Sequence, residues 1–147
     1  MQMPVKRSVV AVAAGAALAW ILGRLLQWLV WPRVLGAGLL DLDQLLGRLL
    51  FILVGAIPVV IGGYVAARLA PRQPLRHGLA VGVLLLLGVL VDLPRILRAY
   101  EAVPQPMWPL LLSMALRPLA GMGGAYLTGR VLPQLRGPDP SAVSSAE

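Results

Sequence analysis

The sequence predicts an all-α membrane protein that folds as a bundle of four transmembrane helices. Of its 147 residues, 59% are hydrophobic and only 13% are charged, whereas an average soluble domain is about 45–50% apolar and about 25% charged. The apolar residues are gathered in long runs, and most charged residues lie between these runs. A soluble domain of this size leaves much of its surface exposed, so the simplest solvent for this chain is lipid.

Four segments are long and apolar enough to cross a bilayer core of about 30 Å, which takes roughly 20 residues. These predicted spans are residues 9–31, 49–69, 75–95 and 107–132. They form one predicted transmembrane domain, residues 1–135. The tail, residues 136–147, is rich in Pro, Ser and Ala, a composition that predicts disorder.

The first predicted span begins like a secretory signal peptide. Lys6 and Arg7 precede the apolar residues 9–17, and residues 17–19 resemble a small-residue cleavage site. The apolar character continues to Trp31, however, which is too long for a signal peptide. The sequence therefore favours a retained span over a cleaved leader.

Residues 34–47 admit two interpretations. The segment carries Asp41, Asp43 and Gln44 among leucines. It is either a short helix lying on the membrane surface or the extended start of the second span. Its polar face is sparse for a surface helix, which favours the second interpretation.

The orientation follows from the positive-inside rule, under which Lys and Arg accumulate in cytoplasmic loops. One side of the predicted bundle carries seven such residues: Lys6, Arg7, Arg68, Arg72, Arg76, Arg130 and Arg136. The other side carries four, mixed with acidic residues: Arg33, Arg48, Arg95 and Arg98. Both termini and the tail are therefore predicted to be cytoplasmic.

A ten-residue motif that closes the second span recurs, 62 residues later, at the end of the fourth. Tyr64 with Arg68, and Tyr126 with Arg130, are its matched anchors, predicted to hold each helix at the inner interface where such side chains prefer to lie. One interpretation is a duplication, which gives two tandem helical hairpins in the same orientation. The other is that any inward-ending helix uses the same residues.

Both closing spans also carry a proline near mid-membrane, Pro58 and Pro118, and each is followed by a glycine within four residues. Proline removes a backbone hydrogen bond, so both positions are predicted helix bends. Interrupted spans at matching positions of two halves indicate a binding site. Proline and glycine are also common in membrane helices, so the pattern does not establish a site.

Small residues predict where the helices pack, because helix association in lipid depends on close backbone approach. They recur at four-residue spacing in the first and fourth spans and once in the third: Ala11, Gly15, Ala19, Gly23, Gly78, Gly82, Gly121, Ala125 and Gly129. Such stripes predict a tight bundle and suit a homo-oligomer or a membrane-protein partner equally well.

Arg117 is the most informative charged residue, because it lies ten residues into the fourth span, about 15 Å from Met107. An arginine near the bilayer centre costs at least about 2.5 kcal/mol. Asp92 is its predicted partner, since the apolar residues 79–91 are too few to cross a bilayer without it. This candidate intramembrane ion pair either fixes helix register or binds an anionic substrate.

The sequence offers little to catalysis or cofactors. There is no cysteine and one histidine, His77, which together cannot build an ordinary zinc site. No nucleophile–base set or phosphate-binding loop is present. We therefore expect no enzyme, metal or cofactor. The net charge of +7 is dispersed around apolar runs, so we expect the lipid bilayer rather than nucleic acid as partner.

One stretch resembles a pattern in small uncharacterised bacterial four-span membrane proteins. It is Gly-Gly-Tyr-Val-Ala-Ala-Arg-Leu-Ala-Pro at residues 62–71, followed by Pro74 and by His-Gly-Leu-Ala at residues 77–80. The resemblance implies the bacterial inner membrane and no known activity. The first hypothesis is a non-catalytic accessory or scaffold bundle. The second is a small solute transporter or channel subunit with an Arg/Asp site, and a membrane enzyme ranks last.

Overall fold

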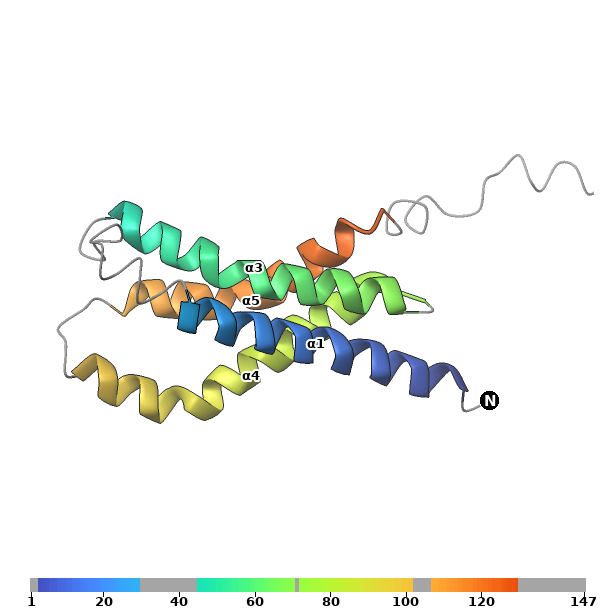
Figure 1. Cartoon of the computed structure of the whole chain (residues 1–147), viewed down its shortest axis with the longest axis horizontal. Helices are drawn as coiled ribbons and strands as arrows, with labels where there is room; N and C mark the ends of the chain where they lie inside the picture. The colour runs from blue at the N-terminus through green and yellow to red at the C-terminus, as the bar shows by residue number, and fades with distance from the viewer. Residues whose placement is uncertain (1–2, 30–44, 71, 102–106, 130–147) are drawn as a thin grey trace, which may run out of the picture.

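The computed structural model describes residues 3–29, 45–70, 72–101 and 107–129, and it places four α-helices in these ranges (Figure 1). In chain order they are α1 (Met3–Leu29), α3 (Leu45–Leu69), α4 (Pro74–Glu101) and α5 (Trp108–Tyr126). The described part of the chain contains no strand. The all-α fold class is therefore confirmed.

Prolines mark several of the helix boundaries. α3 ends at Leu69, shortly before Pro71, because the residue before a proline disfavours the helical conformation. Pro74 then starts α4, where its missing N–H is not needed. Gln73 takes a left-handed φ of 53° in the turn between them, which lets α4 return antiparallel to α3.

Three of the helices are long and apolar enough to cross a membrane, through the segments Lys6–Leu26, Gly47–Leu69 and Pro74–Arg98. These agree with the first three predicted spans. α5 is not among them, because one arginine, two prolines and three glycines lower the apolar content of its 19 residues. The predicted end at residue 132 is also too late, since α5 ends at Tyr126 and a turn follows.

The second span starts earlier than predicted, since α3 already begins at Leu45. Residues 45–47 are therefore its first turn, as the extended-start interpretation requires. Residues 34–44 and the tail 136–147 lie outside the described residues, so the surface-helix alternative and the disorder prediction stay predictions.

α3 has the most extensive contacts of the four helices, because it packs along both α5 and α1 and also meets α4. α4 also packs along α5, and α1 meets α4 more briefly. One end of the bundle holds the start of α1 and the α3–α4 turn; we call it the N-terminal end. Toward the opposite end, α4 diverges from α1 and α5 (Figure 1).

Seven glycines hold the helices together at close range, and we call them the glycine seam: Gly15, Gly62, Gly63, Gly78, Gly82, Gly121 and Gly124. A Cβ added at any of them would meet backbone of a neighbouring helix. Gly15 of α1 lies on Gly62 of α3, while Gly121 of α5 lies on both Gly63 and Gly78. The seam therefore joins all four helices through backbone contacts, as expected of helices packed in lipid.

Two of the predicted packing residues lie outside these contacts. A Cβ added at Gly23 would have no heavy atom of another segment within 4 Å. Gly129 follows the end of α5 with φ 67°, and its added Cβ would also meet nothing. The remaining predicted positions are buried in the described bundle: Ala11, Gly15, Ala19, Gly78, Gly82, Gly121 and Ala125.

Candidate functional site

Arg117 is the middle residue of α5, with nine helical residues on each side. Its backbone carbonyl and the Cα of Pro118 lie directly against Gly82 of α4, where a Cβ would not fit. This close approach brings the partly buried Arg117 side chain alongside the next turn of α4. There the guanidinium Nη1 donates a hydrogen bond of 3.3 Å to the Leu85 carbonyl oxygen.

This hydrogen bond satisfies little of what the side chain requires. A guanidinium carries five N–H donors and a full charge, whereas Leu85 offers one neutral acceptor. Carboxylate partners bind arginine about twice as strongly as neutral acceptors do. Among the described residues, Arg117 therefore keeps donors that a further ligand could occupy.

Asp92, the predicted partner of Arg117, lies elsewhere. It is exposed on α4, seven residues after Leu85 and therefore about 10 Å further along the helix. The Arg117 guanidinium bonds to Leu85 and has no contact with this carboxylate. The predicted ion pair is thus not formed. The Arg117 side chain bonds to α4 at Leu85, about one helical turn after Gly82, and Asp92 lies two further turns along α4 toward the opposite end.

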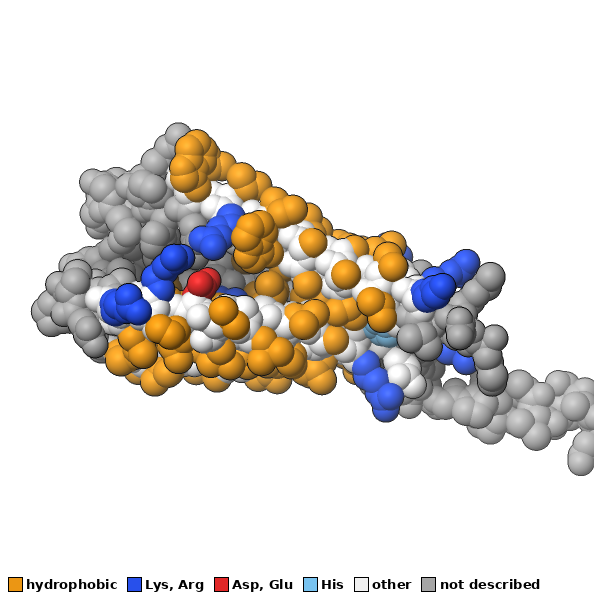
Figure 2. Space-filling model, turned by 90° about the horizontal axis from the view of Figure 1, so that it is seen from below, with side chains coloured by type: hydrophobic (Ala, Val, Ile, Leu, Met, Phe, Trp, Pro, Cys, Tyr) orange, Lys and Arg blue, Asp and Glu red, His pale blue; other side chains and the backbone are white. Residues whose placement is uncertain are grey.

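The diverging ends of α1 and α4 leave a hollow at the opposite end of the bundle. Figure 2 shows Lys or Arg side chains and one acidic side chain gathered in it, between two arms with apolar outer surfaces. Asp92 is the sole acidic residue whose side chain the structure describes, so it is the acidic group in this hollow. The described charges here are predominantly positive.

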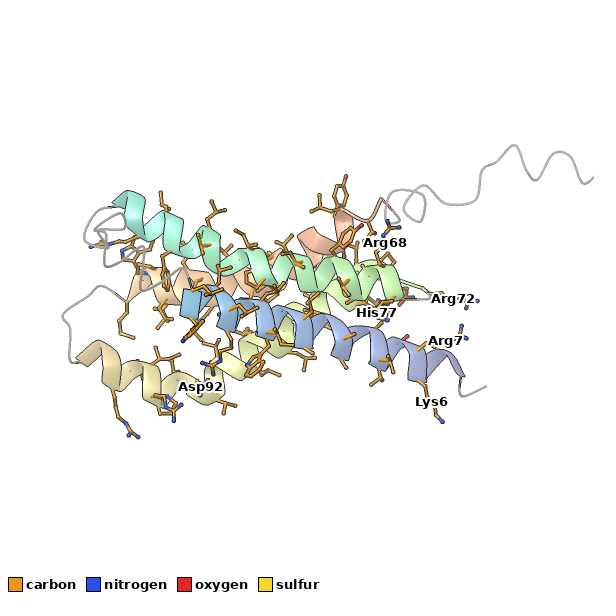
Figure 3. All side chains as sticks on the ribbon, viewed as in Figure 1. Lys6, Arg7, Arg68, Arg72, His77 and Asp92 are labelled. Carbon is orange, nitrogen blue, oxygen red and sulfur yellow. The ribbon has the colours of Figure 1, made fainter. Side chains whose placement is uncertain are left out.

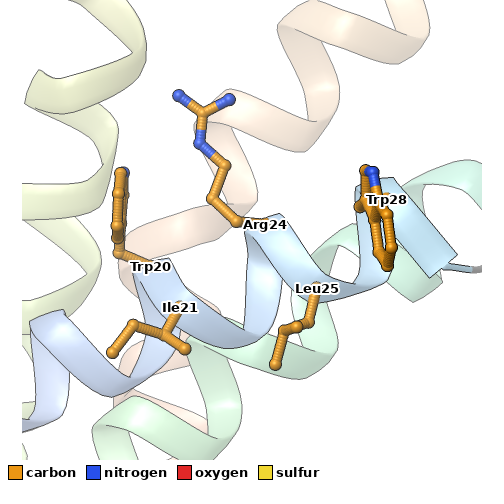
Figure 4. A pocket seen from close by; sticks show the side chains of 5 residues that line it. All are labelled: Trp20, Ile21, Arg24, Leu25 and Trp28. Atoms are coloured by element: carbon orange, nitrogen blue, oxygen red, sulfur yellow. The ribbon is translucent and has the colours of Figure 1, made fainter.

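The C-terminal half of α1 carries an open groove, which is lined by Trp20, Ile21, Arg24, Leu25 and Trp28. The two indole rings and the Arg24 side chain extend from the same face of α1, while Ile21 and Leu25 point to the adjacent face (Figure 4). The Arg24 guanidinium carbon lies 5.4 Å from the centroid of the Trp20 ring. This separation is that of a cation–π contact.

The N-terminal end carries a second set of basic side chains. Figure 3 places Lys6, Arg7, Arg68 and Arg72 at this end, together with His77, while Asp92 lies in the other half. His77 is held locally by a 3.0 Å hydrogen bond between Nδ1 and the Gln73 carbonyl oxygen. The positive charge at this end therefore comes from the α1 start and from the α3–α4 turn.

Of the predicted interface anchors, Arg68 and its partner Tyr64 lie at the N-terminal end. Arg68 Nε donates a 3.1 Å hydrogen bond to the Tyr64 hydroxyl, one helical turn away. The Arg68 guanidinium also lies 5.6 Å from the centre of the Tyr64 ring. Tyr126 is exposed at the last turn of α5, and Arg130 lies outside the described residues.

The predicted bend prolines, Pro58 and Pro118, both lie inside helices that continue past them, in α3 and α5. The matched glycines of the proposed duplication have different partners, since Gly62 meets α1 and Gly124 meets α3. The described residues contain no group of three or more His, Cys, Asp or Glu side chains able to hold a metal ion.

The fold and these polar residues together define an all-helical protein with three helices able to span a membrane. The chain matches no family model, no curated protein and no solved structure. The resemblance to small bacterial four-span proteins therefore stays a prediction.

Proposed function

We propose that the chain is a non-catalytic four-span bundle of a bacterial inner membrane, an accessory subunit or scaffold that acts through helix–helix contacts. The fourth span in this proposal is α5. Its 19 residues extend about 28 Å, close to the thickness of the bilayer core. Its contacts with α3 and α4, which are both candidate spans, support its lying at the same depth.

The proposed orientation places the N-terminal end in the cytoplasm. Lys6, Arg7, Arg68 and Arg72 lie together there (Figure 3), and the positive-inside rule assigns such an end to the cytoplasmic side. An even number of spans then keeps both termini on that side. We accordingly call the N-terminal end the inner end and the opposite end the outer end.

The topology can be tested with single introduced cysteines, because the chain has none of its own. We expect Gly36→Cys to react from the periplasm with a membrane-impermeant maleimide, and Ser145→Cys to react only after the inner membrane is opened. Labelling of both Gly36→Cys and Ser145→Cys in intact spheroplasts would place the two termini on opposite sides and refute the four-span arrangement.

The scaffold proposal is carried by the contrast between the interior and the surface of the bundle. The glycine seam fixes the helices backbone to backbone, and this leaves little freedom for an opening motion. On α4, Leu84, Leu87 and Val91 form a stripe whose exposed fractions are 47%, 50% and 81%. A rigid bundle with apolar outward stripes is suited to docking another membrane helix.

Site-specific crosslinking tests this proposal. A photo-crosslinking residue at Leu87 should give a discrete protein adduct in cells, whereas the same residue at Val81, which is fully buried, should give none. Lipid alone would also cover the α4 stripe, so an absence of adducts along it, from Leu84 to Val91, would contradict a scaffold role.

A second function, a small solute transporter or channel subunit, is favoured by one specific observation. Arg117, at the middle of α5, bonds to a carbonyl and not to a carboxylate, so its positive charge stays available to an anionic solute. Intramembrane arginines commonly serve such roles. Anion flux into proteoliposomes that is present in the wild type and lost in Arg117→Gln would support this function over the first.

A further inference from the structure

The groove on the outer half of α1 has the composition of a lipid-headgroup site. It is formed by Trp20, Ile21, Arg24, Leu25 and Trp28 (Figure 4). The groove is shallow and widely open to its surroundings, so a ligand in it would keep one side against the lipid. All five residues come from one helix, so α1 alone supplies the whole surface.

Arg24 is the charged group of the groove, and it forms no ion pair with an acidic side chain that the structure describes. Its contact in the described structure is the Trp20 ring, at 5.4 Å, and none of the five lining residues is acidic. Asp92, the one described acidic side chain, is on α4 and does not line the groove. Arg24 is exposed, so its planar fork of N–H donors is accessible to an anion.

The position of Arg24 along α1 indicates which anion it meets. Arg24 is 17 residues past Arg7, about 26 Å along the helix. With Arg7 at the inner interface, Arg24 lies just below the outer edge of a core of about 30 Å. Trp28 lies one turn further out, at the depth where indole rings are enriched. The anion at this depth is the phosphate of an outer-leaflet phospholipid.

We propose that this groove binds one anionic phospholipid of the outer leaflet. This assignment rests on the proposed membrane orientation. Arg24 donates hydrogen bonds to the phosphate, since a guanidinium matches phosphate oxygens in bidentate geometry. Trp20 and Trp28 lie on either side of the headgroup, and the acyl chain descends along Ile21 and Leu25, which are 49% and 46% exposed. A lipid with a net negative charge is favoured over a zwitterionic one, because the Arg24 guanidinium repels the ammonium group of a zwitterionic headgroup.

Tryptophan fluorescence provides the test, because the groove contains two of the four tryptophans of the chain. In a background with Trp31→Phe and Trp108→Phe, Trp20 and Trp28 are the remaining reporters. The protein is reconstituted in vesicles that contain brominated phosphatidylglycerol or brominated phosphatidylcholine. We expect quenching to show about a fivefold preference for phosphatidylglycerol, the ratio that corresponds to about 1 kcal/mol per cationic residue near a membrane surface.

Variants of Arg24 and Arg7 distinguish a specific lipid site from general electrostatic attraction. Arg24→Gln should abolish the preference, and Arg24→Lys should keep part of it, since lysine retains the charge without the bidentate fork. Arg7→Gln, which removes one charge at the inner end of the same helix, should leave the preference unchanged. Equal loss in Arg7→Gln and Arg24→Gln, or no preference in the wild type, would overturn the proposal.

Three outcomes of the same assay distinguish failure of the lipid site from failure of the membrane orientation. Quenching by brominated phosphatidylcholine shows whether the indoles lie in lipid at all, so its absence would count against the membrane orientation itself. Normal quenching without headgroup preference would refute the site alone. Loss of the phosphatidylglycerol preference with inorganic phosphate, but not with sodium chloride at the same ionic strength, would identify a soluble-anion site and reject the lipid assignment.

Discussion

The Gly121→Ala substitution is the sharpest test of the packing, because Gly121 lies where three helices meet. A Cβ at Gly121 would fall on the Gly78 carbonyl oxygen and 3.1 Å from the backbone nitrogen of Gly82. Carbon atoms in ordinary contact lie about 3.5–4.0 Å apart, so α4 and α5 would have to separate by roughly 1 Å. Overpacking of this kind costs about 1–3 kcal/mol.

The same helix supplies a matched control in Gly123, whose added Cβ would meet no neighbour within 4 Å. Both substitutions gain about 0.5–1 kcal/mol because alanine is the better helix former. The difference in unfolding free energy between Gly121→Ala and Gly123→Ala therefore reports the packing strain alone, and we expect about 1–3 kcal/mol. Reversible unfolding in mixed micelles, followed by circular dichroism, measures it. Equal stabilities would refute the close α4–α5 contact.

Three further substitutions address the polar residues. Arg117→Met should raise the unfolding free energy by about 1–3 kcal/mol, because it removes a charge whose one hydrogen-bond acceptor among the described residues is the Leu85 carbonyl. A lower unfolding free energy in micelles would contradict this prediction. Asp92→Asn should change the unfolding free energy by less than about 0.5 kcal/mol, since Asp92 is exposed. Exchanging the charges of Asp92 and Arg117 in a double variant should not restore stability lost in either single variant, which thermal melts would measure. Tyr64→Phe removes the exposed hydrogen bond from Arg68 and should lower the unfolding free energy by less than about 1 kcal/mol in the same melts. A larger decrease would show that the pair is buried.

The sequence predicted the helices well because lipid imposes a simple rule on each segment separately. A bilayer span needs about 20 apolar residues, and prolines such as Pro71 and Pro74 limit where helices end and begin. Both signals are local, so α3 and the start of α4 could be placed to within a few residues, whereas α4 continues to Glu101, six residues past the predicted end. α5 was harder, because Arg117 and its glycines reduce the apolar signal of the span.

The helix contacts could not be read in the same way. In water, the apolar stripe of a helix marks its buried face, but a helix in lipid is apolar on its outer face as well. Gly23 and Gly15 therefore look equivalent in the sequence, although Gly15 lies on Gly62 and Gly23 meets nothing. Gly63 was missed for the same reason, since no pattern distinguished it from a lipid-facing glycine.

The sequence by itself determined the solvent of this chain, its helical segments and the unusual position of Arg117, since all three depend on local composition and spacing. Tertiary structure alone decided that seven particular glycines form the seam and that Arg117 bonds to Leu85 and not to Asp92. Those outcomes depend on how each helix is rotated and how α4 diverges from its neighbours. The rotation of each helix and the divergence of α4 are set by the backbone contacts of all four helices together.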